Sequence, residues 1–155
     1  MLRKKTKVKR EGSTLKAAQL KKAKKLSVAK LKKDADKYFS QYIRLRDSNK
    51  FGVAECVTCG DKKPWKQLQN GHFVTRSCNL LRYDDLNCHA QCVACNMFKA
   101  GNLYEYGKQI DLRYGDGTAD RLHAQRHTTH KLKIEELQKI ITDAKEYILE
   151  NNNQN

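Results

Sequence analysis

The sequence predicts a small α+β protein in which an irregular, strand-containing centre lies between a long N-terminal helix and several C-terminal helices. The chain has 155 residues, about one domain's worth. Residues 15–47 favour a helix because Ala, Leu and Lys dominate there and no Gly or Pro interrupts the segment. Residues 50–90 lack helical periodicity and contain several Gly and Asn with short extended runs such as GHFVTR, which is typical of β-hairpins. Helical patterns return after Cys92.

The helices are expected to carry their apolar residues on one face. In the N-terminal helix a stripe at three- and four-residue steps indicates docking on a core; its members are Leu31, Ala35, Tyr38, Phe39, Tyr42 and Ile43. A helix over residues 133–150 has a similar stripe, made of Leu137, Ile140, Ile141, Ala144 and Ile148.

Shorter helices are expected between these two. One begins near Cys92, a second begins at Asn102, with Glu105 as its capping-box partner, and ends at the GDG of residues 115–117. A third covers residues 118–127. The predicted organisation is a disordered basic arm (1–13), a long basic helix (14–49), a core (50–107), C-terminal helices (108–150) and a disordered tail (151–155).

Charge indicates the kind of partner. The net charge is +15, from 32 Lys and Arg against 17 Asp and Glu, and residues 1–33 hold 14 of the basic residues against the single acid Glu11. A polyanion is therefore expected, with nucleic acid first and an anionic membrane surface second. No apolar run approaches about 18 residues and no apolar stretch follows the basic N-terminus, so we expect neither a transmembrane helix nor a signal peptide, and a cytoplasmic protein.

Lysines in the basic segments are the predicted phosphate contacts, although a solvated helix face is the alternative for residues 34–47. The candidates are Lys4, Lys5, Lys21, Lys22, Lys24, Lys25, Lys32, Lys33 and Lys99.

Four of the six cysteines form two C-x2-C pairs, Cys56 with Cys59 and Cys92 with Cys95. Two such pairs supply the four thiolates that tetrahedral zinc prefers. With one pair in a hairpin and the other at the start of a helix, the arrangement is that of a treble clef. Four thiolates leave no open position for water, so the zinc is expected to be structural. Cys78 and Cys88 have no partner at ligand spacing.

Polar residues that could do chemistry lie between and just after the pairs. His72 follows the first pair, Asn87 lies five residues before Cys92, and Cys95 is followed by Asn96 and, three residues later, Lys99. This pattern resembles the HNH, or ββα-metal, nuclease motif in its His–Asn–Asn form. The strings DKYFSQYIRLRD, CVTCG, GHFVTR and DDLNCHAQCVACNMFKAGN, followed by a tyrosine, resemble more narrowly the NinG (Rap) recombination protein family of phage lambda, over about residues 34–106.

The resemblance implies a phage- or prophage-encoded endonuclease that cuts branched DNA, including Holliday junctions and D-loops, during recombination in a bacterial host. It also implies a second, catalytic cation, Mg²⁺ or Mn²⁺, besides the structural zinc. His72 would be the general base, Asn87 would orient its imidazole, Asn96 would offer an oxygen to the cation, and Arg76 would clamp the phosphate.

One position departs from the family pattern. Many HNH nucleases carry an acidic residue or a second His just before the base, where this chain has Gly71. Another cation ligand is therefore needed, and Asp85 is preferred over Asp84 and His89.

Other interpretations remain open at this point. His72 could pack within the hairpin, the two asparagines could be turn or cap residues, and Arg76 could be a surface charge. A non-catalytic zinc-knuckle protein that binds nucleic acid is the main alternative, and a site-specific homing or restriction nuclease is a third. Symmetric cutting of a four-way junction predicts a homodimer, for which the two apolar helix stripes are candidate interfaces.

Overall fold

The computed structural model describes residues 28–152, and the α+β class is confirmed there. Residues 28–46 are helical, in agreement with the predicted helix, whose first part lies outside the described residues. Ala35, Phe39 and Ile43 are buried on one face of it. The predicted stripe therefore docks this helix on the rest of the chain.

Two antiparallel hairpins follow. In the first, β1 (Val53–Glu55) pairs with β2 (Lys62–Pro64), and a 3-10 turn, η1 (Trp65–Gln67), leads out of it. In the second, β3 (Gln69–His72) pairs with β4 (Cys88–Gln91), with His72 opposite Cys88 and Gly71 opposite His89. A long loop, residues 73–87, joins β3 to β4, so His72 lies where β3 ends and this loop begins.

Four helices complete the described chain. A short π-helix, η2 (Ala94–Phe98), comes first, and α2 (Leu103–Tyr114), α3 (Thr118–Ala124) and α4 (Ile134–Asn152) follow. Asn102 does precede α2, but its side chain makes no capping hydrogen bond and its backbone is left-handed, with φ 48°. The predicted capping box is therefore not formed. Residues 151 and 152 are helical, where the sequence predicted the disordered tail to begin.

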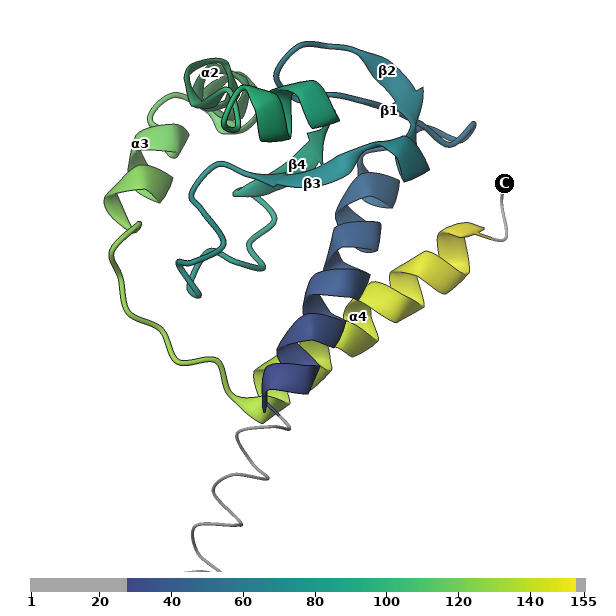
Figure 1. Ribbon diagram of the computed structural model, residues 1–155, viewed down its shortest axis with the longest axis vertical. Helices are drawn as coiled ribbons and strands as arrows, with labels where there is room; N and C mark the ends of the chain where they lie inside the picture. The colour runs from purple at the N-terminus through teal and green to yellow at the C-terminus, as the bar shows by residue number, and fades with distance from the viewer. Residues whose placement is uncertain (1–27, 153–155) are drawn as a thin grey trace, which may run out of the picture.

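The β3–β4 hairpin lies between two helical groups (Figure 1). On one side α2 and α3 supply Tyr106, Ile110 and Leu122 to a core shared with residues of the 73–87 loop. On the other side, Phe39 and Ile43 pack with Cys88 and with Ile140 of α4. Leu137 and Ala144 of α4 are buried as well.

This packing bears on the predicted homodimer. The buried members of both apolar stripes contact their own chain, so they are not available as a surface for a second copy.

Within residues 28–152, no helix has the length and apolar content needed to cross a membrane.

Candidate active site and metal centre

The four paired cysteines converge on one point. The Sγ atoms of Cys56, Cys59, Cys92 and Cys95 all lie within 4.8 Å of one another, and those of Cys59 and Cys92 are 3.8 Å apart. Zinc–sulfur bonds of about 2.3 Å in a tetrahedron put the sulfurs about 3.8 Å apart. The cluster could therefore hold one zinc ion, which fits the prediction for these four residues.

The thiols of this cluster differ in pKa. Burial alone would raise the pKa of Cys56, but hydrogen bonds from the Cys92 backbone N–H (3.3 Å) and from Thr58 lower it to about 6. Burial, together with the neighbouring Cys56 and Cys95 thiols, raises the pKa of Cys59 to about 12. One thiolate thus forms readily, and the positive charge of a metal ion would favour the others.

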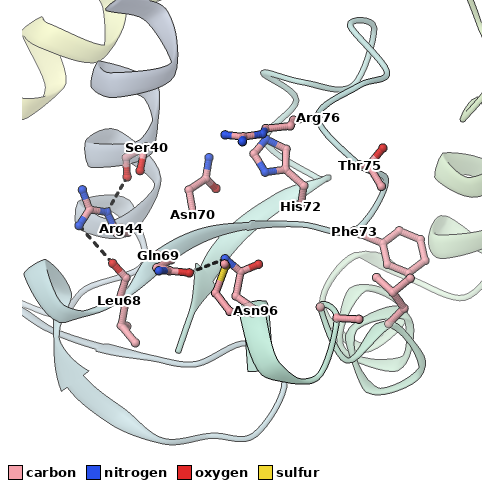
Figure 2. Close-up of a pocket in the computed structure, with 14 residues that line it drawn as sticks. Ser40, Arg44, Leu68, Gln69, Asn70, His72, Phe73, Thr75, Arg76 and Asn96 are labelled. Atoms are coloured by element: carbon pink, nitrogen blue, oxygen red, sulfur yellow. Dashed lines mark hydrogen bonds between the residues drawn. The ribbon is translucent and has the colours of Figure 1, made fainter. Parts of the chain in front are cut away.

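A cavity of about 600 Å³ opens beside this cluster, between residues 28–46, β3 and the η2–α2 junction. We call it the His72 cavity. His72, Arg76 and Asn96, three of the four predicted catalytic residues, all line it (Figure 2). Among residues 28–152, no Asp or Glu lines it, whereas Arg44 and Arg76 do. Its charge therefore suits an anion.

The His72 ring is held in one orientation by the 73–87 loop. Its Nε2 lies 3.1 Å from the backbone carbonyl of Arg82. A carbonyl only accepts hydrogen bonds, so Nε2 carries the proton and the Nδ1 of the neutral ring is the basic nitrogen. Burial lowers the pKa of His72 below its ordinary value of 6.5, and the positive charges of Arg82 and Arg76 add to this effect. The ring is therefore neutral at pH 7.

Asn87 has a different task from the expected one. Its side chain is fully buried and forms hydrogen bonds with both backbone groups of Val74, at 2.7 and 2.9 Å, and with the carbonyl of Leu81 at 2.9 Å. These bonds occupy the amide, and none joins Asn87 to the His72 ring. Asn87 therefore fixes the two ends of the loop that carries the carbonyl of Arg82, and it affects His72 only through that loop.

Asn96 presents an oxygen to the cavity. Its Nδ2 donates to Oε1 of Gln69 at 2.6 Å, so the amide is oriented by β3 and its Oδ1 is left without a partner among the described residues. Asn70 also lines the cavity, and its buried Oδ1 has no hydrogen-bond partner among the described residues. The Asn96 oxygen is thus available to a ligand that donates hydrogen bonds or carries positive charge, whereas the Asn70 oxygen is buried.

The residues proposed to complete a cation site lie elsewhere. Asp85 is exposed, pairs with Arg46 at 3.2 Å and lines a second cavity with Phe39, Tyr42 and Tyr83. The prediction that it joins Asn96 is corrected, because the 73–87 loop carries it to the α4 side of the hairpin. Asp84 accepts from the backbone of Leu86 and Asn87. His89 is fully buried between the hydroxyls of Tyr106 and Tyr114, at 3.2 and 2.8 Å.

The predicted lysine contacts can be placed only in part. Lys4, Lys5, Lys21, Lys22, Lys24 and Lys25 lie outside the described residues. Lys33 and Lys99 are exposed. Lys32 donates to Asn79 Oδ1 at 2.8 Å, so it is engaged within the chain.

Comparison with known proteins decides the family. The family described as Bacteriophage Lambda NinG protein matches residues 1–154. This chain belongs to the NinG family. Protein ninG of Escherichia phage 933W is 33% identical over 109 residues, which cover 70% of this chain and 51% of that protein. The matches to protein ninG of Escherichia phage lambda and of Salmonella phage P22 have the same identity and length.

This NinG-family chain spans about half the length of these relatives. No solved structure matches it significantly.

The sequence did not single out Arg82, which connects the NinG-family site to the helix of residues 28–46. Its guanidinium donates to both carboxylate oxygens of Asp36, at 2.8 and 2.6 Å, and to the backbone carbonyl of Arg76. Its own carbonyl holds His72. The sequence also did not predict three other residues of the cavity, because an amide or an arginine outside the HNH motif carries no signal of its own. They are Arg44, Gln69 and Asn70.

Proposed function

We propose that this protein is a metal-dependent endonuclease of the HNH type that cuts branched DNA in phage recombination. The observation that carries the proposal is the neutral His72, with its Nδ1 unprotonated, in a cavity that it shares with Asn96 and two arginines. Phosphodiester hydrolysis needs an activated water, a bound phosphate and relief of charge on the leaving oxygen. These side chains can meet the first two needs.

The order of the elements supports the same proposal. A β-hairpin, β3–β4, is followed by a helical segment that carries Asn96, with a four-cysteine cluster beside it. This is the arrangement expected of a ββα-metal core stapled by a structural zinc.

In the proposed mechanism, Nδ1 of His72 takes a proton from a water molecule that attacks the phosphorus. Arg76 binds a non-bridging phosphate oxygen, and Arg44 lies across the cavity from it to bind a neighbouring phosphate. Gln69 and Asn87 are positioning residues, acting on Asn96 and on the loop behind His72.

The cavity could hold a catalytic cation only if water and phosphate oxygens supply most of its ligands. Oδ1 of Asn96 is the oxygen that would hold it, and no carboxylate of residues 28–152 lines the cavity. Mg²⁺ or Mn²⁺ keeps several waters and binds phosphate oxygens, so a weak protein site is compatible with binding together with DNA. When bound, the cation would neutralise charge on the phosphate and the leaving oxygen.

The alternative function is a non-catalytic, zinc-stabilised nucleic-acid-binding protein. The observation in its favour is that, among residues 28–152, the four cysteines are the only cluster of three or more His, Cys, Asp or Glu able to hold a metal. The +15 charge suits both functions.

A cleavage assay separates the two. A synthetic four-way junction and a linear duplex of matched sequence would be incubated with the protein and Mg²⁺, Mn²⁺ or no added cation. We expect cation-dependent nicks in the junction, and a loss of roughly 10²–10⁴-fold in His72→Ala. His123→Ala, which changes an exposed histidine of α3, is the matched control. Tight binding without cleavage under every condition would favour the non-catalytic protein.

We also propose that a homodimer is the working form, since one His72 supplies one cut and a four-way junction needs two related by two-fold symmetry. Light scattering of the free protein and of its junction complex tests this. A monomer in both states would overturn the dimer and leave the nuclease unaffected.

A further inference from the structure

The segment that supplies Met97 and Leu103 to the wall of the His72 cavity carries large apolar side chains that face solvent. Met97 and Phe98 of η2 are 63% and 84% exposed, and Leu103 and Tyr104 at the start of α2 are 47% and 75% exposed. Met97 and Leu103 also line the cavity itself. We call these four residues the apolar rim.

The apolar rim is separate from the hydrophobic core. The same segment has its own inward-facing residues, Cys95 in the metal cluster and Tyr106 in the core beneath α2, and both are buried. Ala100 and Asn102 are the only residues other than glycine with positive φ among those described, and they form the turn between η2 and α2. Single exposed apolar residues are common, but four within eight positions beside a cavity indicate a binding surface.

The charges around the rim indicate what would bind. Lys99 lies between the two exposed pairs, and no ion pair involves it among the described residues. Nζ of Lys108 sits 4.1 Å from the centre of the Tyr104 ring, while also pairing with Glu105 at 3.2 Å. Arg76 lies in the adjoining cavity. The partner therefore combines flat apolar surface with negative charge, as a nucleic-acid strand with uncovered bases does.

We propose that Phe98 and Tyr104 form a stacking platform for unpaired or unstacked DNA bases next to the phosphate that is cut. The proposal rests on the proposed function and adds to it a source of selectivity for branched DNA. In a continuous duplex, each base face is covered by its neighbours. At a branch point or in a single strand, a base face is open to an aromatic ring, and every base has such a face.

The position of the platform fits this role. Met97 and Leu103, which line the His72 cavity, are the chain neighbours of Phe98 and Tyr104, so the proposed platform lies beside that cavity. Lys99 is placed to contact a backbone phosphate of the same strand. A linear duplex can reach Arg76 and Lys99 with its phosphates, but it offers no base face to Phe98.

The test measures binding without cleavage. No divalent cation is added, so that the DNA is not cut, and no chelator is used, so that the zinc stays bound. Fluorescence anisotropy would compare a four-way junction, a single strand and a linear duplex. Phe98→Ala combined with Tyr104→Ala should weaken binding to the junction and the single strand about tenfold, equivalent to about 1.4 kcal/mol, and leave duplex binding nearly unchanged. Phe98→Trp combined with Tyr104→Phe should retain wild-type affinity.

Leu112→Ala is the matched control, because Leu112 is an exposed apolar residue of α2 that does not line the cavity. It should bind all three DNAs like the wild type. A 2-aminopurine placed at the branch should be quenched by the wild type and not by the double alanine variant.

Two results would overturn the platform. They are an unchanged affinity of the double alanine variant for the junction, and an equal loss of affinity for the duplex. The proposed function fails separately: if His72→Ala cleaves like the wild type while the double alanine variant loses junction affinity, the platform stands and the assigned base does not.

Discussion

Arg82 shows how a residue that touches no substrate can determine the geometry of the site. Its carbonyl orients His72, and its guanidinium bridges the carbonyl of Arg76 to Asp36 on the helix of residues 28–46. Tyr83 Oη donates to the same carboxylate at 2.8 Å. The His72 ring and the backbone of Arg76 are thus tied to one ion pair, in which Arg82 is buried and Asp36 is half-buried.

Removing the acid of this pair should loosen the site. Burial alone would raise the pKa of Asp36, but the bonds from Arg82 and Tyr83 outweigh it and lower the pKa below 3.8. A lowered acid pKa means that the stabilisation is fully present at neutral pH and is lost only as the pH falls through that lowered value. At pH 7, Asp36→Asn should therefore lose roughly 1–3 kcal/mol of unfolding free energy and cleave more slowly.

Asp143→Asn is the control for Asp36→Asn, since it removes an exposed carboxylate paired with Lys139 on the surface of α4. Its unfolding free energy in urea should change by less than about 1 kcal/mol. Equal losses in the two variants would mean that the Asp36–Arg82 pair has no special role.

The pH dependence of cleavage should reveal the state of His72. The base must be neutral to accept a proton, and burial together with nearby Arg82 and Arg76 lowers its pKa below 6.5. The rate should therefore decline on the acid side with a midpoint below pH 6.5. A plot of log rate against pH from 5 to 8 checks this. An acid-side inflection above 6.5 that disappears in His72→Ala would contradict the assigned environment.

Spacing alone predicted that the four paired cysteines converge, because two residues between thiols let both sulfurs reach one ion. His72 and Asn96, singled out by the resemblance to the HNH motif, do line one cavity. The task of Asn87 and the place of Asp85 depend on how the 73–87 loop folds back, which periodicity does not encode. The link from Asp36 to Arg82 joins residues 46 positions apart and has no sequence signal.

At the scale of elements, the long helices were predictable because their stripes repeat over many turns. The η2–α2 junction was less so. Asn102 has the residue type and the position of a capping residue, but its left-handed backbone takes its side chain out of capping geometry. The extent of β3 and β4 follows from pairing between distant segments, and the sequence indicated only their region.

The β3–β4 hairpin explains the glycine before His72. A Cβ on Gly71 would lie 2.4 Å from Oε1 and 2.9 Å from Cβ of Gln91, a buried residue of the partner strand. Gln91 in turn donates to the carbonyl of Gly101 at 2.7 Å, at the start of the turn into α2. The space that a residue-71 side chain would need is therefore taken by a side chain that ties the hairpin to the following helix.

Gly71→Ala should thus destabilise the protein by about 1–3 kcal/mol through overpacking. Gly107→Ala is the matched control: the nearest atom to its Cβ is a Phe73 ring carbon at 3.4 Å, and Ala favours a helix interior, so stability should stay level or rise. Thermal unfolding measures both. If Gly71→Ala proves as stable as the wild type, Gln91 can move aside and the hairpin is not closely packed there.

At the scale of the whole molecule, the cysteine cluster joins segments that lie far apart in the sequence. It brings the β1–β2 turn, with Cys56 and Cys59, to the residues that follow β4, with Cys92 and Cys95. The core around it is small, made of Ala54, Leu68, Ala90 and the buried cysteines, with Trp65 against it. Asn96 follows Cys95 directly, so the wall of the His72 cavity depends on the cluster.

Loss of zinc should therefore unfold this centre and abolish cleavage together, because the binding free energy of a structural metal is folding free energy. Elemental analysis should find one zinc per chain, and Cys92→Ser should lose both the zinc and the cooperative thermal transition. Cys78→Ser is the control, since Cys78 is a buried cysteine of the α2–α3 core that lies outside the cluster. It should keep the metal, with at most a modest fall in stability. Full cleavage by a zinc-free chain, or a Cys92→Ser variant that melts like the wild type, would show that the four thiols do not hold the fold.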